Sequence, residues 1–170
     1  IRKYKITKFH YLGGILDILI KKKSKKIDRN HKVKLAFGAG SRKETYYEFK
    51  ERFNIPLREV YGMTEASSFT TINFKNKLGS IGRVLPWFKL KIVNKINGIG
   101  EIVINQKQKG LFTKGYYKDN KSSKMLLQKD GLHTGDLGKI DRMGNVFYIG
   151  RLKDFVRVKG ENISSWEIET

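Results

Sequence analysis

The segment from residue 33 to residue 62 constrains the fold more than any other part of the chain. It reads VKLAF, then GAGSRKETYYEFKERFN, then IPLREVYG. The first and last pieces are short, largely apolar runs between turn residues, which indicates strands, whereas Tyr46, Phe49 and Phe53 in the middle piece have helical spacing. A strand, a glycine turn, a helix and a second strand form a βαβ unit, whose strands run parallel in one sheet.

A second helix is predicted just before this unit, in YLGGILDILIKK. Its apolar residues recur at i, i+3, i+4, i+7 and i+8 and predict one buried stripe: Leu12, Ile15, Leu16, Leu19 and Ile20. The lysine-rich run from Lys21 to Lys26 is expected to end this helix, because cations stabilise a helix C-terminus. In the later helix, Ser41 with Glu44 three residues on predicts a capping box.

Beyond Thr71 the pattern changes to that of antiparallel strands. FKLKIVN and GEIVIN flank a KING turn, LGKIDRMGNVFYIG predicts a hairpin, and DFVRV predicts a further strand. Between them LFTKGYYKDNKSSKML predicts a loop with one short helix. The predicted fold class is therefore α/β plus β, a βαβ layer followed by an antiparallel β subdomain.

The charge is strongly basic, with 36 Lys and Arg against 16 Asp and Glu and a formal net charge of +20. A nucleic-acid-binding domain would explain this excess, and so would a solvated lysine surface. The excess falls along the chain, and 27 of the 36 basic residues are lysine, which favours the surface interpretation and no nucleic-acid partner.

The composition also excludes several classes of site. There is no cysteine, so disulfides, zinc thiolates and thiol nucleophiles are absent. No apolar run approaches the ~20 residues of a membrane span, so a soluble, cytoplasmic protein is expected. The chain begins at Ile1 rather than methionine and stops within NISSWEIET, which indicates a fragment of a longer protein.

YGMTE follows the second predicted parallel strand, and ligands bind at the carboxyl ends of such strands. Tyr61 offers a ring to stack on a base, Thr64 a hydroxyl for a phosphate oxygen, and Glu65 a hard oxygen ligand for Mg²⁺. Alternatively, Glu65 caps a helix or pairs with a surface lysine.

GAGS follows the first parallel strand. It does not match a dinucleotide fingerprint, because Lys43 stands where the third glycine should be, and the Walker pattern is absent. A glycine turn exposes bare backbone that can lie flat against an adenine ring, although a plain tight turn is the simpler interpretation.

HTGDLG and GRLKD carry the remaining polar groups of interest. Asp136 could accept hydrogen bonds from both ribose hydroxyls or form an Asx turn before a strand. His133 has no second histidine or cysteine beside it, so a structural role is favoured over metal ligation. Arg151 can make fork-like bonds to ribose or phosphate.

In this order YGMTE, GYYKDN, HTGD and GRLKDFVRVKGENISSWEIE resemble the adenylate-forming superfamily, which includes acyl-CoA synthetases, peptide-synthetase adenylation domains and luciferases. KFHYLGGILDIL and AFGAGSRKE look most like bacterial acid–CoA ligases. The resemblance implies the large N-terminal domain of that fold, divided into residues 1–75 of the nucleotide-binding subdomain, 76–150 of the β subdomain, and 151–170, a hinge leading to a C-terminal domain.

The resemblance implies two half-reactions, in which a carboxylic acid and ATP·Mg²⁺ give acyl-AMP and coenzyme A then displaces AMP. Fatty-acid or other lipid metabolism is a natural setting. The implied nucleotide-binding residues are Gly38, Ala39, Gly40, Tyr61, Gly62, Thr64, Asp136 and Arg151. The implied catalytic residues are Thr64, Glu65 and Arg151. Glu65 is also the implied Mg²⁺ ligand.

The remaining implied roles concern the second half-reaction and the acid. Lys153 falls at the hinge position, Lys159 and Gly160 lie in the thioester-forming segment, and Phe9, His10 and Tyr11 line the acyl or CoA tunnel. The family's upstream Ser/Thr/Gly-rich loop and its C-terminal lysine are missing, so these 170 residues are expected to be inactive alone. Two alternatives stay open, namely an adenylation domain that loads a carrier protein and a non-catalytic basic nucleic-acid-binding domain.

Overall fold

The computed structural model describes residues 1–158 and 161–164, with side chains described through residue 154. The chain folds into two compact units. The first comprises Ile1–Tyr61 and Thr71–Arg83, and the second Gly62–Thr70 and Val84–Thr170. The domain ranges that the sequence analysis gives stay predictions.

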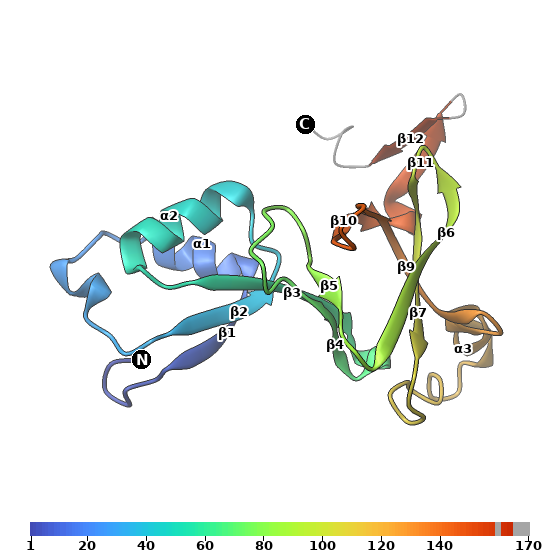
Figure 1. The fold of residues 1–170 in the computed structure, drawn as a ribbon, viewed down its shortest axis with the longest axis horizontal. Helices are drawn as coiled ribbons and strands as arrows, with labels where there is room; N and C mark the ends of the chain where they lie inside the picture. Colours follow the sequence, from blue (N-terminus) through green and yellow to red (C-terminus); the bar gives the residue numbers. More distant parts are fainter. Residues whose placement is uncertain (159–160, 165–170) are drawn as a thin grey trace. The chain divides into compact units, whose positions relative to one another are not determined.

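The first unit contains the predicted βαβ arrangement (Figure 1). Three parallel strands are adjacent in the order β1, β2, β3, and both α-helices lie along the same face of them in Figure 1. The elements are β1 (Lys8–Leu12), α1 (Gly13–Lys21), the 3-10 helix η1 (Lys26–Arg29), β2 (Leu35–Ala39), α2 (Lys43–Phe53) and β3 (Leu57–Met63). The strand–turn–helix–strand prediction is confirmed.

The core of this unit forms where the helices meet the strands. Its buried members are Tyr11, Leu16, Val33, Ala36, Phe49, Ile55 and Leu57. Tyr46 and Phe53 pack against them, which confirms the apolar face predicted for α2. Asp17 of α1 also accepts a hydrogen bond from Thr45 of α2 at 2.7 Å, so a polar contact joins the two helices.

Three details of the first unit differ from the sequence prediction. Lys8–Leu12 is a strand that the periodicity did not predict. The α1 stripe is only partly buried, because Leu12 is 58% and Ile15 45% exposed, and Leu16 alone is fully buried. The capping box is wrong: Arg42 is the N-cap of α2, no side chain caps it, and the Ser41 hydroxyl donates to the Arg42 carbonyl.

The sheet continues beyond β3 through β4 (Ser68–Ile72) to β5 (Arg83–Val84), in the order β1-β2-β3-β4-β5. Between β3 and β4 the chain makes the short 3-10 helix η2 (Thr64–Ala66), which ends at Ser67 with a φ of 56°. The YGMTE motif therefore spans the end of β3 and this turn.

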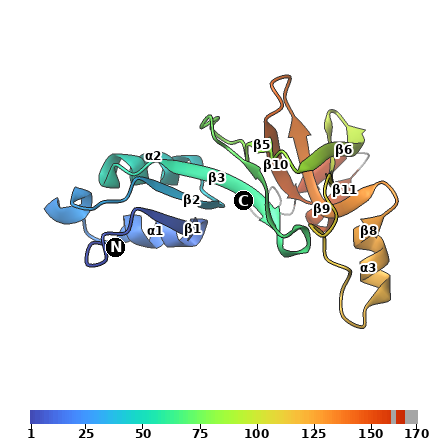
Figure 2. The same cartoon turned by 60° about the horizontal axis from the view of Figure 1, so that its bottom comes forward.

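The second unit is built on an antiparallel sheet of order β10-β9-β7-β6, with β8 paired to β9. Figure 2 shows α3 beside β8. The elements are β6 (Phe88–Ile96), β7 (Ile99–Gln106), α3 (Asn120–Leu126), β8 (Leu127–Gln128), β9 (Gly131–Ile140) and β10 (Val146–Arg151). Both predicted hairpins and the predicted short helix are confirmed.

After β10 a 3-10 turn, η3 (Leu152–Asp154), leads to a two-stranded ladder of β11 (Phe155–Val158) and β12 (Glu161–Ser164). The predicted strand DFVRV corresponds to β11. Among the residues that the structure describes, no helix has the length and apolar character needed to span a membrane.

Candidate nucleotide site

The glycine loop of the first unit, residues 38–41, leads from the end of β2 toward α2 and packs closely against β1 and the start of α1. A Cβ on Gly38 would lie 1.9 Å from the Tyr11 carbonyl oxygen, and a Cβ on Gly13 would lie 1.9 Å from the Gly40 carbonyl oxygen. Gly40 itself has a φ of +80°, a conformation that side-chain-bearing residues rarely adopt. Glycine is therefore required here for both space and backbone conformation.

Glu59 on β3 holds this loop from the neighbouring strand. Its Oε1 accepts the backbone N–H groups of Gly40 at 2.6 Å and Ser41 at 3.2 Å, and its Oε2 accepts the Tyr11 hydroxyl at 3.0 Å. Burial raises the pKa of Glu59, and these hydrogen bonds oppose the rise. The sequence analysis missed this residue, although a lone acid within the strand LREVY is an unusual feature.

The three residues predicted to line an acyl or CoA tunnel all lie on β1, but they face two sides. Tyr11 is fully buried in the core, and Phe9 packs against the same core 6.5 Å from the Phe49 ring. Burial raises the pKa of Tyr11 well above its usual range. His10 is exposed and lies 5.4 Å from the Phe37 ring, so their role as a common tunnel lining stays a prediction.

Tyr61 and Gly62 lie next to each other near the end of β3. Tyr61 is only 9% exposed, so most of its ring already packs inside the protein. A Cβ on Gly62 would lie 1.6 Å from the Ser68 carbonyl oxygen, which shows how tightly β3 meets the segment that follows η2. The stacking role of Tyr61 stays a prediction.

Glu65 lies in η2 and is tied to the loop that carries GYYKDN. The Tyr116 hydroxyl donates to Glu65 Oε1 at 2.6 Å, and the Thr113 N–H donates to the Glu65 carbonyl at 2.8 Å. The hydrogen bond to Glu65 raises the pKa of Tyr116. The role of Tyr116 could not be read from the GYYKDN motif, because its partner lies 51 residues away in the sequence. A carboxylate oriented in this way, with Thr64 exposed beside it, fits a hard-cation ligand.

Asp136 and Arg151 form an ion pair across two adjacent strands, β9 and β10. Arg151 Nε lies 3.0 Å from Asp136 Oδ1, and the side chains are 47% and 5% exposed respectively. Arg151 Nη1 also donates to the Thr134 carbonyl at 3.2 Å. A carboxylate and a guanidinium side by side are a donor and acceptor set that fits ribose hydroxyls.

The charge of Arg151 acts on tyrosines near both pairs of residues in the second unit. The pKa of Tyr116 is raised mainly by Glu65, and the positive charge of Arg151 opposes that rise. The pKa of Tyr148 is raised by burial and by Asp136, again with opposition from Arg151. The second unit therefore brings together a metal-ligand candidate, a ribose-ligand candidate and a half-exposed arginine.

Lys153, predicted as the hinge, is exposed in η3 between β10 and β11. A short 3-10 turn between two strands is compatible with that role, which stays a prediction. Lys159 and Gly160 lie outside the described residues. His133 is hydrogen-bonded through both ring nitrogens to carboxylates, Glu101 and Asp130, which agrees with the structural role favoured by the sequence analysis.

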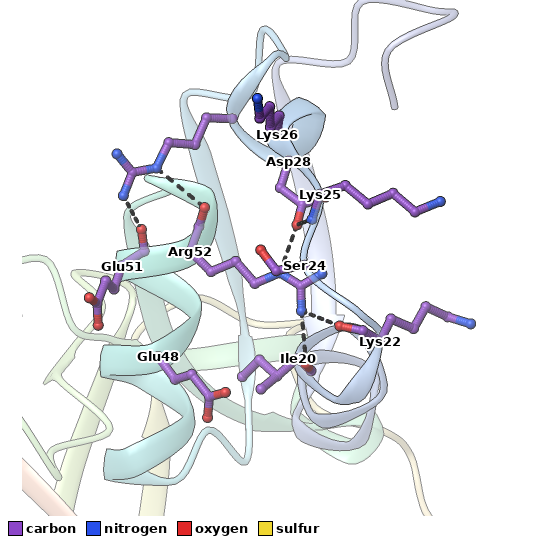
Figure 3. A pocket seen from close by; sticks show the side chains of 10 residues that line it. Ile20, Lys22, Ser24, Lys25, Lys26, Asp28, Glu48, Glu51 and Arg52 are labelled. Atoms are coloured by element: carbon purple, nitrogen blue, oxygen red, sulfur yellow. Dashed lines mark hydrogen bonds and ion pairs between the residues drawn. The ribbon is translucent and has the colours of Figure 1, made fainter.

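A groove of about 560 Å³ in the first unit contains none of the predicted site residues (Figure 3). Arg52 of α2 extends across it and donates to the carbonyls of Ile20 at 2.8 Å and Lys22 at 2.6 Å, while its Nε pairs with Asp28 at 2.8 Å. These carbonyls lie at the C-terminal end of α1, where backbone acceptors lack helical partners. Arg52 therefore joins α2 to the C-terminal end of α1 across this groove, which is a structural role.

Comparison with known proteins gives a consistent result. Residues 1–117 match the family model described as AMP-binding enzyme. The chain is 31% identical over 189 residues to the 2-succinylbenzoate–CoA ligase of Oceanobacillus iheyensis, covering 99% of this chain and 38% of that protein. It is 32% identical over 184 residues to the luciferin 4-monooxygenase of Nipponoluciola cruciata, covering 100% of this chain and 33% of that protein.

Among solved structures, the ATP-bound MatB of Rhodopseudomonas palustris has a TM-score of 0.79 and 27% sequence identity, covering 98% of this chain and 35% of that one. The chain thus spans between a third and two-fifths of the length of these relatives. The fold confirms the predicted adenylate-forming N-terminal architecture. The chain belongs to the family of AMP-binding enzymes.

Proposed function

We propose that the complete protein is an ATP-dependent carboxylic acid–CoA ligase. The observation that carries this proposal is the grouping of Glu65 with Tyr116 and Asp136 with Arg151 in the second unit, on the motifs that resemble this superfamily. Family membership and a relative named as a CoA ligase support it. Lipid metabolism is a natural setting for such an enzyme.

In the first half-reaction a carboxylate oxygen attacks the α-phosphorus of ATP, and the bond to pyrophosphate breaks, which leaves acyl-AMP. In the second, the thiol sulfur of coenzyme A attacks the acyl carbon and AMP leaves. Negative charge develops on the phosphate in the first step, so preoriented cations and donors lower its barrier. When bound, Mg²⁺ supplies this neutralisation without proton transfer.

The residues of this chain would divide that work. Glu65, oriented by the Tyr116 hydroxyl, would hold the metal, and the exposed Thr64 would contact phosphate. Asp136 would accept the ribose hydroxyls, with Arg151 beside it. The backbone of residues 38–40, which Glu59 holds in place, would lie against adenine, with Tyr61 on the other side of the ring.

Two further roles belong to the change between half-reactions. Lys153, exposed in the turn after β10, would serve as the hinge for a C-terminal domain. Lys159 and Gly160 would belong to the segment that forms the thioester. An adenylation domain that passes its acyl group to a carrier protein would use the same first half-reaction, so the acceptor needs its own test.

The decisive experiment is acid-dependent ATP–pyrophosphate exchange by the complete protein, with a panel of short, long, aromatic and betaine-type acids. The proposal predicts Mg²⁺-dependent exchange with one acid class, followed by AMP release when CoA is added. Absence of exchange with every acid, in folded protein, would contradict adenylation, and exchange without CoA-dependent release would favour a carrier acceptor.

The metal role of Glu65 is tested in the same assay with Glu65→Gln, which keeps the shape of the side chain but removes its charge. We expect exchange to fall by about 10²-fold, the size typical of losing one transition-state electrostatic contact. Glu44→Gln, an exposed glutamate on α2, is the matched control and should leave exchange unchanged. An unchanged rate with normal Mg²⁺ dependence in Glu65→Gln would contradict the assignment.

A further inference from the structure

We propose that Glu101 is a positioning residue for nucleotide binding, because it fixes the backbone bulge that carries Asp136. This inference rests on the proposed function for the role of Asp136, but its structural part concerns only the second unit. Glu101 lies on β7, in the GEIVIN segment, to which the sequence analysis assigned a strand and no function.

The register between β7 and β9 shows where the bulge lies. Glu101 pairs with Leu137, and Val103 pairs with His133. Two steps along β7 therefore correspond to four along β9, so β9 carries extra residues within the segment Thr134–Asp136. A bulge of this kind redirects a side chain and is held only if its unpaired backbone groups find partners.

Glu101 supplies one such backbone partner from the adjacent strand and also contacts the side chain of His133. Its Oε1 accepts the Gly135 N–H at 3.0 Å, and its Oε2 lies 2.8 Å from His133 Nδ1. The side chains of Glu101 and His133 are both only 12% exposed. One carboxylate thus binds the residue before the bulge and the residue at its centre, which fixes the path of the chain into Asp136.

Thr134 completes the bulge from within. Its hydroxyl donates to the Ile102 carbonyl at 2.8 Å and accepts the Asp136 N–H at 3.1 Å. Gly135 has a φ of +68°, so it is the residue of this segment that needs a left-handed conformation. The backbone of Asp136 is therefore connected to β7 by two routes, through Thr134 and through Glu101.

The charges around this bulge extend to two more elements. His133 Nε2 lies 2.8 Å from Asp130 Oδ1, and Asp130 Oδ2 accepts Lys91 Nζ of β6 at 2.9 Å. Burial lowers the pKa of His133, but its hydrogen bonds to Asp130 and Glu101 outweigh burial and raise it overall. A doubly donating imidazolium satisfies both carboxylates at once, whereas neutral imidazole can donate to only one.

The test compares Glu101→Ala and Glu101→Gln in the complete protein. We expect Glu101→Ala to raise the KM for ATP about tenfold, the effect of leaving the partly buried Gly135 amide without its acceptor, with the KM for the acid unchanged. Glu101→Gln keeps an acceptor for Gly135 and should recover most of the affinity. Glu48→Ala, an exposed glutamate on α2, is the control. A KM for ATP within twofold of wild type in Glu101→Ala would overturn the positioning role.

Hydrogen exchange tests the structural part without nucleotide. The amide of Gly135 should exchange about tenfold faster or more in Glu101→Ala than in the wild type, and near the wild-type rate in Glu101→Gln. Unchanged exchange in Glu101→Ala would overturn the inference even if the enzyme is active. Conversely, a wild-type protein that catalyses no ATP–pyrophosphate exchange would overturn the proposed function. Faster hydrogen exchange at the Gly135 amide in Glu101→Ala would still support the contact between Glu101 and Gly135.

Discussion

Two glycine-containing segments of the molecule, residues 38–41 and the bulge 134–136, are each held by a glutamate on a neighbouring strand, yet Gly38 and Gly135 are required for different reasons. At Gly38 the constraint is space, because a Cβ would lie 1.9 Å from the Tyr11 carbonyl oxygen. A Cβ on Gly135 would lie 4.0 Å from its nearest neighbour, Arg151 Nη1, so the constraint there is a φ of +68°. Steric exclusion thus explains Gly38, whereas backbone conformation explains Gly135, as it also does Gly40.

The two glutamates also differ in the groups that they contact. Glu59 accepts only neutral donors, the N–H groups of Gly40 and Ser41 and the Tyr11 hydroxyl, and burial raises its pKa. Glu101 faces His133, which in turn faces Asp130. Each segment therefore needs a hydrogen-bond acceptor, but only the second acceptor contacts a titratable imidazole, so the stability of the second segment should respond to pH near neutrality.

The largest effect is expected from Gly38→Ala. The added methyl group would overlap backbone that cannot move without disturbing β1, so we expect a loss of about 3 kcal/mol or more in the free energy of unfolding. Gly14→Ala is the matched control, since nothing lies within 4 Å of its Cβ and α1 should gain up to about 1 kcal/mol. Equal denaturant midpoints for the two variants would show that space at Gly38 is not limiting.

The next prediction tests whether Glu59 acts as a hydrogen-bond acceptor or through its negative charge. Glu59→Leu leaves the amides of Gly40 and Ser41 and the hydroxyl of Tyr11 without their partner, and should cost about 2–4 kcal/mol of unfolding free energy at pH 7. Glu59→Gln keeps an acceptor and should cost less than about 1 kcal/mol. If the glutamine variant is as unstable as the leucine variant in denaturant unfolding, the charge of Glu59 is essential and its role as a simple hydrogen-bond acceptor is wrong.

Gly135→Ala should have a smaller effect than Gly38→Ala, about 1–2 kcal/mol, because the methyl group has room but the left-handed conformation is unfavourable. Gly135→Asn should cost less than the alanine variant, since asparagine visits this conformation more readily. Unfolding midpoints of the two variants check the order. A loss for Gly135→Ala as large as that for Gly38→Ala would mean that the bulge is sterically closed.

The smallest effect is a pH dependence confined to the second segment. Because the folded pKa of His133 is raised above 6.5, its contribution to stability is complete below about pH 6.5 and is lost as the pH rises through the folded pKa. Asp130 has a pKa lowered from 3.8 to about 2, so its contribution is complete above pH 3.8 and is lost as the pH falls toward 2. The cluster is therefore fully formed between about pH 4 and 6.5.

The variant His133→Gln should remove the alkaline part of this dependence. Unfolding free energies measured from pH 5 to pH 9 would then decline less steeply in the variant than in the wild type. Parallel curves for the two proteins would show that His133 does not couple the bulge to pH.

The sequence predicted the βαβ unit and the hairpins because their apolar periodicity is local and strong. It missed β1, since KFHYL is short and runs directly into the helical pattern that begins at Leu12. It also predicted a capping box at Ser41, where Glu59 on β3 instead accepts the Ser41 N–H. A tertiary partner thus replaced the local one.

In the candidate site, too, local features could be predicted from the sequence and long-range contacts could not. Motif residues such as Glu65 and Asp136 could be named from the sequence, but the groups that orient the site could not. Glu59 reaches Gly40 across 19 residues, Glu101 reaches Gly135 across 34, and Tyr116 reaches Glu65 across 51. No periodicity or short motif links positions that far apart, so only the folded chain shows these pairs.

The most direct test of the account is hydrogen exchange of the complete protein with and without saturating ATP·Mg²⁺, followed at the amides of residues 38–41 and 133–137. If both segments bind the nucleotide, exchange should slow in both, and Asp136→Ala should abolish protection at its own segment. If neither segment is protected at any attainable nucleotide concentration, the assignment of these residues to nucleotide binding is wrong.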